Sequence, residues 1–170
     1  MFKKWLLFAI IILLPGEYAM AFTLTTSAWE SNGSIPKQYT CDGTNISPSL
    51  TWHNPPVGTK SFILIMDDPD APAGTWTHWV LFNIPADIHS FPENLHQLPQ
   101  GTLSVKNSAG HARYDGPCPP DREHRYFFNL YALNTQLEPK AGEDLKTLRN
   151  AMHGHVIGNA RLEGRYNRKR

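Results

Sequence analysis

Acidic, imidazole and phenol side chains recur beside prolines at two places in this chain where an apolar run begins or ends. The first place is the segment 67–83, DDPDAPAGTWTHWVLFN, which contains Asp68, Asp70, Trp76 and His78. Carboxylates accept hydrogen bonds and attract cations, whereas an imidazole donates or accepts near neutral pH. Together these groups have the chemistry to bind a small charged ligand or to transfer protons.

The second place is the segment 114–133, YDGPCPPDREHRYFFNLYAL, in which His124 and Tyr126 follow a proline-rich loop that contains Gly116 and Pro117. Successive side chains of a strand point to opposite faces, so His124 and Tyr126 are expected on one side. Imidazoles, a Tyr hydroxyl and a loop N–H are the donors that an anion needs.

Ordinary turn chemistry is the alternative explanation of the first segment. Asp accepts hydrogen bonds from nearby backbone amides and Pro fixes φ, so an Asp-Pro-Asp sequence is common in turns that bind nothing. A lone His beside Trp is also more often a packed residue than a ligand. This segment by itself leaves both explanations open.

Three apolar runs must position the candidate residues. Phe62–Met66 precedes the carboxylates, Trp79–Phe82 follows the first histidine, and 126–133 follows the second. All three have the length of buried strands. Pro69 and Pro72 cannot donate to a sheet, so a loop is expected between the first two runs. If the strands share one sheet, the two loops meet at one end and surround a hollow.

The remaining pattern predicts a mainly β domain of two packed sheets with one C-terminal α-helix. Helical spacing and acidic residues near the first turn place the helix at 143–152, with Gly154 as its stop. Further strands are expected at 22–25, 35–41, 49–52, 101–105 and 156–166.

The first 21 residues have the features of a cleavable signal peptide. Lys3 and Lys4 precede the apolar core Trp5–Leu14, and Ala19-Met20-Ala21 is a cleavage signal. The core is too short for a transmembrane span, and no Cys follows it as a lipid attachment point, so no membrane anchor is expected. The mature chain, 22–170, should form a single domain in the periplasm or outside the cell.

Removal of Lys3, Lys4 and Glu17 leaves 14 basic and 14 acidic residues in the mature chain. A neutral domain lacks the clustered positive face that nucleic acid requires, which excludes that class of partner. Cys41 and Cys118 are most simply explained as a disulfide in an exported protein, with two free thiols as the alternative. In the chain-entropy account such a bond contributes roughly 4 kcal/mol.

Taken in order, the motifs resemble the phosphatidylethanolamine-binding protein family, also called Raf kinase inhibitor proteins. The resemblance rests on Asp68-Pro69-Asp70-Ala71-Pro72, Trp76-x-His78, Gly116-Pro117-x-Pro119-Pro120 and His124-Arg125-Tyr126. The phrase at 41–52, CDGTNISPSLTW, is similar to the bacterial Raf kinase inhibitor-like branch. The resemblance implies a Greek-key β-sandwich of antiparallel sheets with a small anion-binding pocket for phosphate, phosphorylethanolamine or a similar group.

The resemblance also implies the residues of that pocket and no cofactor. They are Asp68, Asp70, Trp76, His78, the backbone at Gly116 and Pro117, His124 and Tyr126. The two carboxylates would repel a bare dianion, so we expect them to hold the histidines charged and the loop in shape, or to meet an ammonium group. This chain departs from the family at Asp121-Arg122-Glu123, where a glycine is often found.

Three classes of function follow. The favoured one is a binding protein for a small phosphorylated or zwitterionic ligand. The second is a protein-interaction or inhibitor module, and the sheet edges of a sandwich also permit a homodimer. The third is metal-assisted phosphoester hydrolysis by the Asp and His residues. The sequence has no HExxH motif and no nucleophile elbow, which argues against an enzyme, and no set of metal ligands is assigned.

Overall fold

The chain forms two β-sheets and one α-helix in a computed structural model that describes residues 20–168. Most of the expected signal segment therefore lies outside the described residues. The larger sheet has, in spatial order, β2 (Gly33–Ser34), β9 (Val156–Tyr166), β8 (His124–Leu133), β4 (Ser61–Asp68), β5 (Trp76–Pro85) and β7 (Leu103–Ser104). The smaller sheet has β1 (Thr23–Thr25), β3 (Leu50–His53) and β6 (Ser90–Phe91). All neighbouring strands are antiparallel except β2 and β9, which are parallel.

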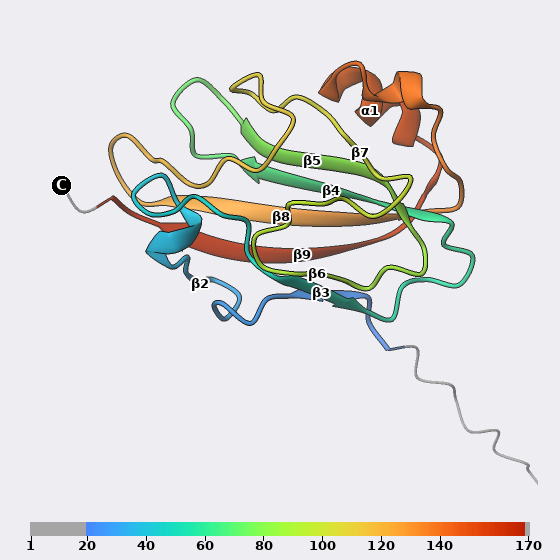
Figure 1. Ribbon diagram of the computed structural model, residues 1–170, viewed down its shortest axis with the longest axis horizontal. Helices are drawn as coiled ribbons and strands as arrows, with labels where there is room; N and C mark the ends of the chain where they lie inside the picture. The colour runs from blue at the N-terminus through green and yellow to red at the C-terminus, as the bar shows by residue number, and fades with distance from the viewer. Residues whose placement is uncertain (1–19, 169–170) are drawn as a thin grey trace, which may run out of the picture.

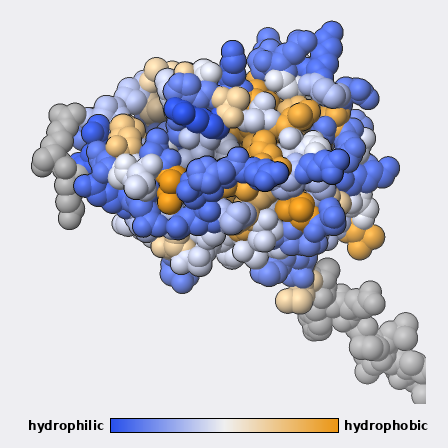
Figure 2. Space-filling model, viewed as in Figure 1, coloured by the Kyte–Doolittle hydropathy of each residue, from blue (hydrophilic) through white to orange (hydrophobic). Residues whose placement is uncertain are grey.

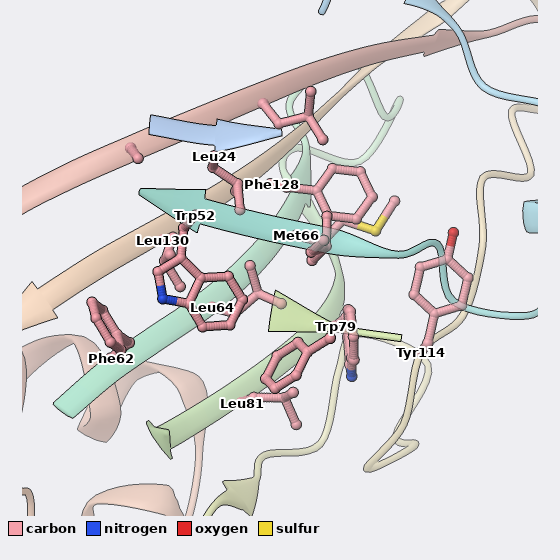
Figure 3. Packing of buried hydrophobic residues seen from close by; sticks show 14 of the residues in the cluster. Leu24, Trp52, Phe62, Leu64, Met66, Trp79, Leu81, Tyr114, Phe128 and Leu130 are labelled. Carbon is pink, nitrogen blue, oxygen red and sulfur yellow. The ribbon is translucent and has the colours of Figure 1, made fainter. Parts of the chain in front are cut away.

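The central strand β4 is buried along its whole length because both of its faces are covered. Phe62, Leu64 and Met66 face the smaller sheet and pack in the core between the sheets (Figure 3). The ring of Trp52, from β3, lies edge-on to Phe62 with the centroids 5.7 Å apart. A continuous apolar run is the sequence expected of a strand that is buried on both faces.

The opposite face of the larger sheet is covered by α1 (Leu145–Met152), which lies above β5 and β7 in Figure 1. Leu148 and Met152 are buried against the outward-facing side chains of β4 and β5. Asp144 caps the helix by accepting a hydrogen bond from the Thr147 N–H at 2.7 Å. Arg149 donates to the β4 carboxylate of Asp67 at 2.8 Å and so ties the helix to the sheet.

The expectation of two packed sheets with one helix is confirmed, and β9 has the predicted bounds. The predicted strand at 35–41 is wrong. Lys37–Tyr39 forms the 3-10 helix η1, preceded by Pro36 at φ −60° and closed by the Thr40 hydroxyl, which donates to the Lys37 carbonyl. The strands β2 and β6 were not predicted, since two residues are too few to show a periodic pattern. A second 3-10 helix, η2 (Pro139–Gly142), precedes α1.

The loop between β4 and β5 is shorter than predicted. Asp67 and Asp68 end β4, and Trp76 to His78 begin β5, so that Asp68 pairs with Trp76 across the two strands. Three of the candidate residues therefore stand on strands and not in a loop. Backbone hydrogen bonds of the sheet fix their positions.

The surface is mostly hydrophilic on the face seen in Figure 2, with hydrophobic side chains in the gaps between polar ones. The most exposed large apolar side chains lie at Met20 and Val57. Within residues 20–168, no helix combines the length and the hydropathy that a bilayer crossing requires.

Candidate ligand-binding site

A cavity of about 600 Å³ lies at one end of the larger sheet. The loop between β4 and β5 and the loop that leads into β8 extend from that end, at the left of Figure 1. The apolar walls of the cavity are formed by Ala71, Pro72, Ala73, Trp76, Ala109, Pro119, Pro120 and the Cys41–Cys118 disulfide. Its other lining residues are Asn45, Asp68, His78, His111, Asp115, Gly116 and His124.

His124 is clamped between two carboxylates. The Nδ1 atom of the His124 ring lies 2.7 Å from Asp68 Oδ2, and its Nε2 atom lies 3.0 Å from Asp121 Oδ1. Burial by itself would lower the pKa of His124. The hydrogen bonds to Asp68 and Asp121 outweigh burial, so the pKa is raised overall. Two carboxylate acceptors favour the imidazolium, with both N–H groups donating. His124 therefore adds a positive charge, but both of its N–H groups are already occupied.

Asp70 does not line the cavity. Its carboxylate accepts two hydrogen bonds from the Arg125 guanidinium, at 2.7 and 2.8 Å, and a third from the Arg125 backbone N–H at 2.9 Å. These hydrogen bonds hold the pKa of Asp70 well below its usual range. Asp70 thus fixes the β4–β5 loop to the start of β8, as expected for a carboxylate that shapes the loop.

His78 has one ring nitrogen occupied and one without a partner. Its Nδ1 lies 2.8 Å from the Asp115 carbonyl oxygen, which can only accept, so Nδ1 carries a proton. Burial lowers the pKa of His78, which favours the neutral ring. The buried Nε2 is then a hydrogen-bond acceptor, and no side chain or backbone group of residues 20–168 donates to it.

Tyr126 lies behind the imidazoles and does not line the cavity. Its ring centroid is 5.3 Å from that of His78, edge-on, and 6.5 Å from that of His124, stacked. The hydroxyl is fully buried and makes no hydrogen bond within the described part of the chain. Burial, followed by the nearby carboxylates of Asp68 and Asp70, raises the pKa of Tyr126, so the phenol stays protonated.

The loop predicted to supply a backbone donor is anchored in another way. The Gly116 N–H donates to Asn45 Oδ1 at 2.8 Å, and the Pro117 carbonyl accepts from the Cys41 N–H at 3.1 Å. A Cβ at Gly116 would lie 2.1 Å from the Tyr39 carbonyl oxygen, so only glycine fits there. The disulfide between Cys41 and Cys118, 77 residues apart, is confirmed and closes this wall.

His111 and Asp115 line the cavity and were missed in the sequence. His111 Nδ1 lies 2.7 Å from Asp115 Oδ2, which also accepts from Asn107 Nδ2 at 2.7 Å. Burial would raise the pKa of Asp115, but the hydrogen bonds from Asn107 and His111 lower it overall. His111 lies between the two segments in which candidate residues were expected, and Asp115, although inside the second segment, belongs to none of the motifs. The one available signal was a His and an Asp four residues apart next to Gly116.

Trp76 stands at the rim, with 39 % of its surface exposed. Five of the eight predicted pocket residues line one cavity: Asp68, Trp76, His78, Gly116 and His124. The other three, Asp70, Pro117 and Tyr126, are not among its lining residues.

Residues 20–168 contain no group of three or more His, Cys, Asp or Glu side chains arranged to hold a metal ion. The arrangement offers neutral and charged imidazoles, carboxylates and apolar walls within one hollow.

Comparison with known protein families matches residues 25–167 to the family described as phosphatidylethanolamine-binding protein. The chain belongs to this family. A UPF0098 protein of Methanothermobacter thermautotrophicus is 50 % identical over 148 residues, which cover 85 % of this chain and 98 % of the relative. A UPF0098 protein of Aquifex aeolicus is 42 % identical over 146 residues, covering 83 % and 85 %.

Two solved structures of the phosphatidylethanolamine-binding protein family share the fold. The putative homologue CT736 of Chlamydia trachomatis has a TM-score of 0.82 and 38 % identity, with coverage of 88 % of this chain and 99 % of that chain. YbcL of E. coli has a TM-score of 0.82 and 31 % identity, with coverage of 88 % and 100 %.

Proposed function

We propose that this phosphatidylethanolamine-binding protein relative binds a small phosphorylated or zwitterionic ligand in the cavity, without turnover. The observation that carries the proposal is the buried Nε2 of the cavity-lining His78, which has no hydrogen-bond partner among residues 20–168. A buried polar group without a partner is destabilising, so a ligand that pairs with it gains affinity.

The chemistry of this atom fits a protonated phosphoryl group. The neutral His78 Nε2 can accept a hydrogen bond from a P–OH group. The imidazolium of His124, which lines the same cavity, adds positive charge, although its own N–H groups are occupied. Carboxylates at Asp68 and Asp115 suit the ammonium group of a zwitterion.

The apolar walls favour an organic ligand over a bare ion. Pro72, Trp76 and Pro119 offer carbon surface near the mouth of a cavity of about 600 Å³. Ligand sites commonly combine such surface with a few polar groups that fix orientation. Phosphorylethanolamine supplies the phosphate, the ammonium and the carbon chain together.

We also propose that the protein acts outside the cytoplasm, in the periplasm or beyond. The predicted signal segment and the Cys41–Cys118 disulfide support this location, since disulfides persist mainly in oxidising compartments. Fractionation of cells that produce the full chain tests it. Recovery of the protein with its signal segment in the cytoplasm would refute export.

The test of the binding function is an NMR titration of chain 22–170 with phosphate and with phosphorylethanolamine, following the imidazole signals. We expect the His78 signals to shift and saturate, and phosphorylethanolamine to be recovered intact. His78→Phe should weaken binding about tenfold in a calorimetric titration, since it removes the unpaired acceptor of the cavity. The control is His153→Phe, at a histidine that lines a different hollow beside α1. Unshifted His78 signals with both compounds would refute the proposal.

A further inference from the structure

We infer that His111, oriented by Asp115, is a second anion-binding residue of the cavity and takes the role expected of His124. This inference rests on the proposed function and assigns the donor that determines its affinity. Sequence motifs point to His124 as the second imidazole that contacts the anion. Its Nδ1 and Nε2 are, however, held at 2.7 and 3.0 Å from Asp68 and Asp121, which leaves no N–H for a ligand.

The other expected donor is also occupied. The Gly116 N–H donates to Asn45 Oδ1, and Pro117 has no N–H. Tyr126 does not line the cavity and Trp76 stands at its rim, so the expected set leaves the acceptor at His78 Nε2 as its inner unpaired group. An anion in this cavity needs a donor from a further lining residue.

His111 has the geometry to supply that donor. It lines the cavity, and its Nδ1 lies 2.7 Å from Asp115 Oδ2, while its Nε2 has no hydrogen-bond partner within residues 20–168. A carboxylate at Nδ1 fixes the orientation of the ring, and in the imidazolium form the Nε2–H can donate to an anion. Asp115 is itself fixed by Asn107, which donates to Oδ2 at 2.7 Å.

One residue orients both imidazoles. Asp115 accepts from His111 through its carboxylate and from His78 through its backbone carbonyl, each at Nδ1 and at 2.7 and 2.8 Å. Asn107 reinforces this arrangement by donating also to the His78 carbonyl at 2.9 Å. Both rings thus keep Nε2 unpaired and both line the same cavity. The pair matches the donor and acceptor sites of a monoprotonated phosphoryl group.

The test compares two charge-reducing variants of the same loop by calorimetric titration with inorganic phosphate and phosphorylethanolamine. His111→Asn places an amide near the Nδ1 position, keeps the hydrogen bond to Asp115 and removes the Nε2 donor. Lys106→Gln removes a positive charge from an exposed side chain of the same connection that does not line the cavity. We expect His111→Asn to weaken binding of either compound at least about tenfold and Lys106→Gln to change it less than about twofold.

Each outcome decides the inference. Unchanged affinity in His111→Asn, with binding by the wild type, overturns the role of His111 and leaves the proposed function standing. Equal losses in the two variants show a general charge effect and also overturn it. No binding by the wild type refutes the proposed function itself. Thermal melting verifies that both variants are folded, and His111→Gln, which keeps a donor near the Nε2 position, should recover part of the affinity.

Discussion

The two imidazoles predicted from the motifs, His78 and His124, have opposite environments at the scale of single residues. His124 is bonded to carboxylates through both nitrogens, whereas His78 has a carbonyl on one side and an unpaired buried nitrogen on the other. The first environment stabilises the charged ring and the second the neutral ring. The cavity therefore holds an imidazolium and a neutral imidazole at the same pH.

This difference predicts the order of two titrations. His124 should titrate above the ordinary histidine value of about 6.5 and His78 below it. Asp121→Asn should lower the pKa of His124, because it removes one charged acceptor, and leave His78 unchanged. NMR titration of the ring signals measures both values. A His124 that titrates below His78 would contradict the assigned protonation states.

The same shifts give opposite contributions to the free energy of unfolding. The raised pKa of His124 contributes stability that is present below its unfolded pKa of about 6.5 and is lost as pH rises through the folded pKa. The lowered pKa of His78 contributes stability that is present above about 6.5 and is lost as pH falls through its folded pKa. His78→Gln should therefore reduce the acid-side loss, as measured by urea unfolding across this pH range.

At the scale of elements, strands with a long apolar or alternating pattern were predictable and short ones were not. The sequence patterns of β4 and β9 predict strands, because burial on one or both faces requires apolar residues at a strand's spacing. Strand β6 is defined by its pairing with Leu50 and Thr51 of β3. This contact between segments distant in sequence leaves no local pattern from which the strand could be predicted. The segment 35–41 looked extended, yet Pro36 and Thr40 set up the 3-10 helix η1 between them.

The candidate site shows the same limit. The positions of Asp68, His78 and His124 at one end of a sheet followed from motifs beside apolar runs. Their hydrogen-bond partners did not, because Asp121 and Asp115 reach the imidazoles through loop conformation, which no periodic pattern encodes. Which donors remain for a ligand could be known only from the structure.

The packing of α1 predicts a difference between two leucines of the helix. Leu148 is fully buried against the outer face of the larger sheet, whereas Leu145 is only partly buried. Leu148→Ala should lower the free energy of unfolding by about 2–5 kcal/mol, since it leaves a cavity, and Leu145→Ala by less. Urea denaturation measures both. Equal effects would show that α1 does not cover the sheet as described.

At the scale of the whole molecule, the disulfide links the loop after η1 to the proline-rich loop before β8 and forms part of the cavity wall. Replacing Cys41 and Cys118 together by Ser should lower the free energy of unfolding by about 2–5 kcal/mol. Reductant should bring the wild type down to the same value and leave the variant unchanged. Equal stability of wild type and variant without reductant would contradict a structural role of the bond.

The parallel pairing of β2 with β9 has a consequence for the order in which the chain can fold. Gly33 lies beside Gly164, and the inner strand β4 needs β8 as one of its two neighbours. A ribosome releases β4 and β5 well before β8 and β9, so the nascent chain carries an apolar strand whose second neighbour has not yet been made. The large sheet closes only when the final strand arrives, which keeps the polypeptide open until translation is almost complete.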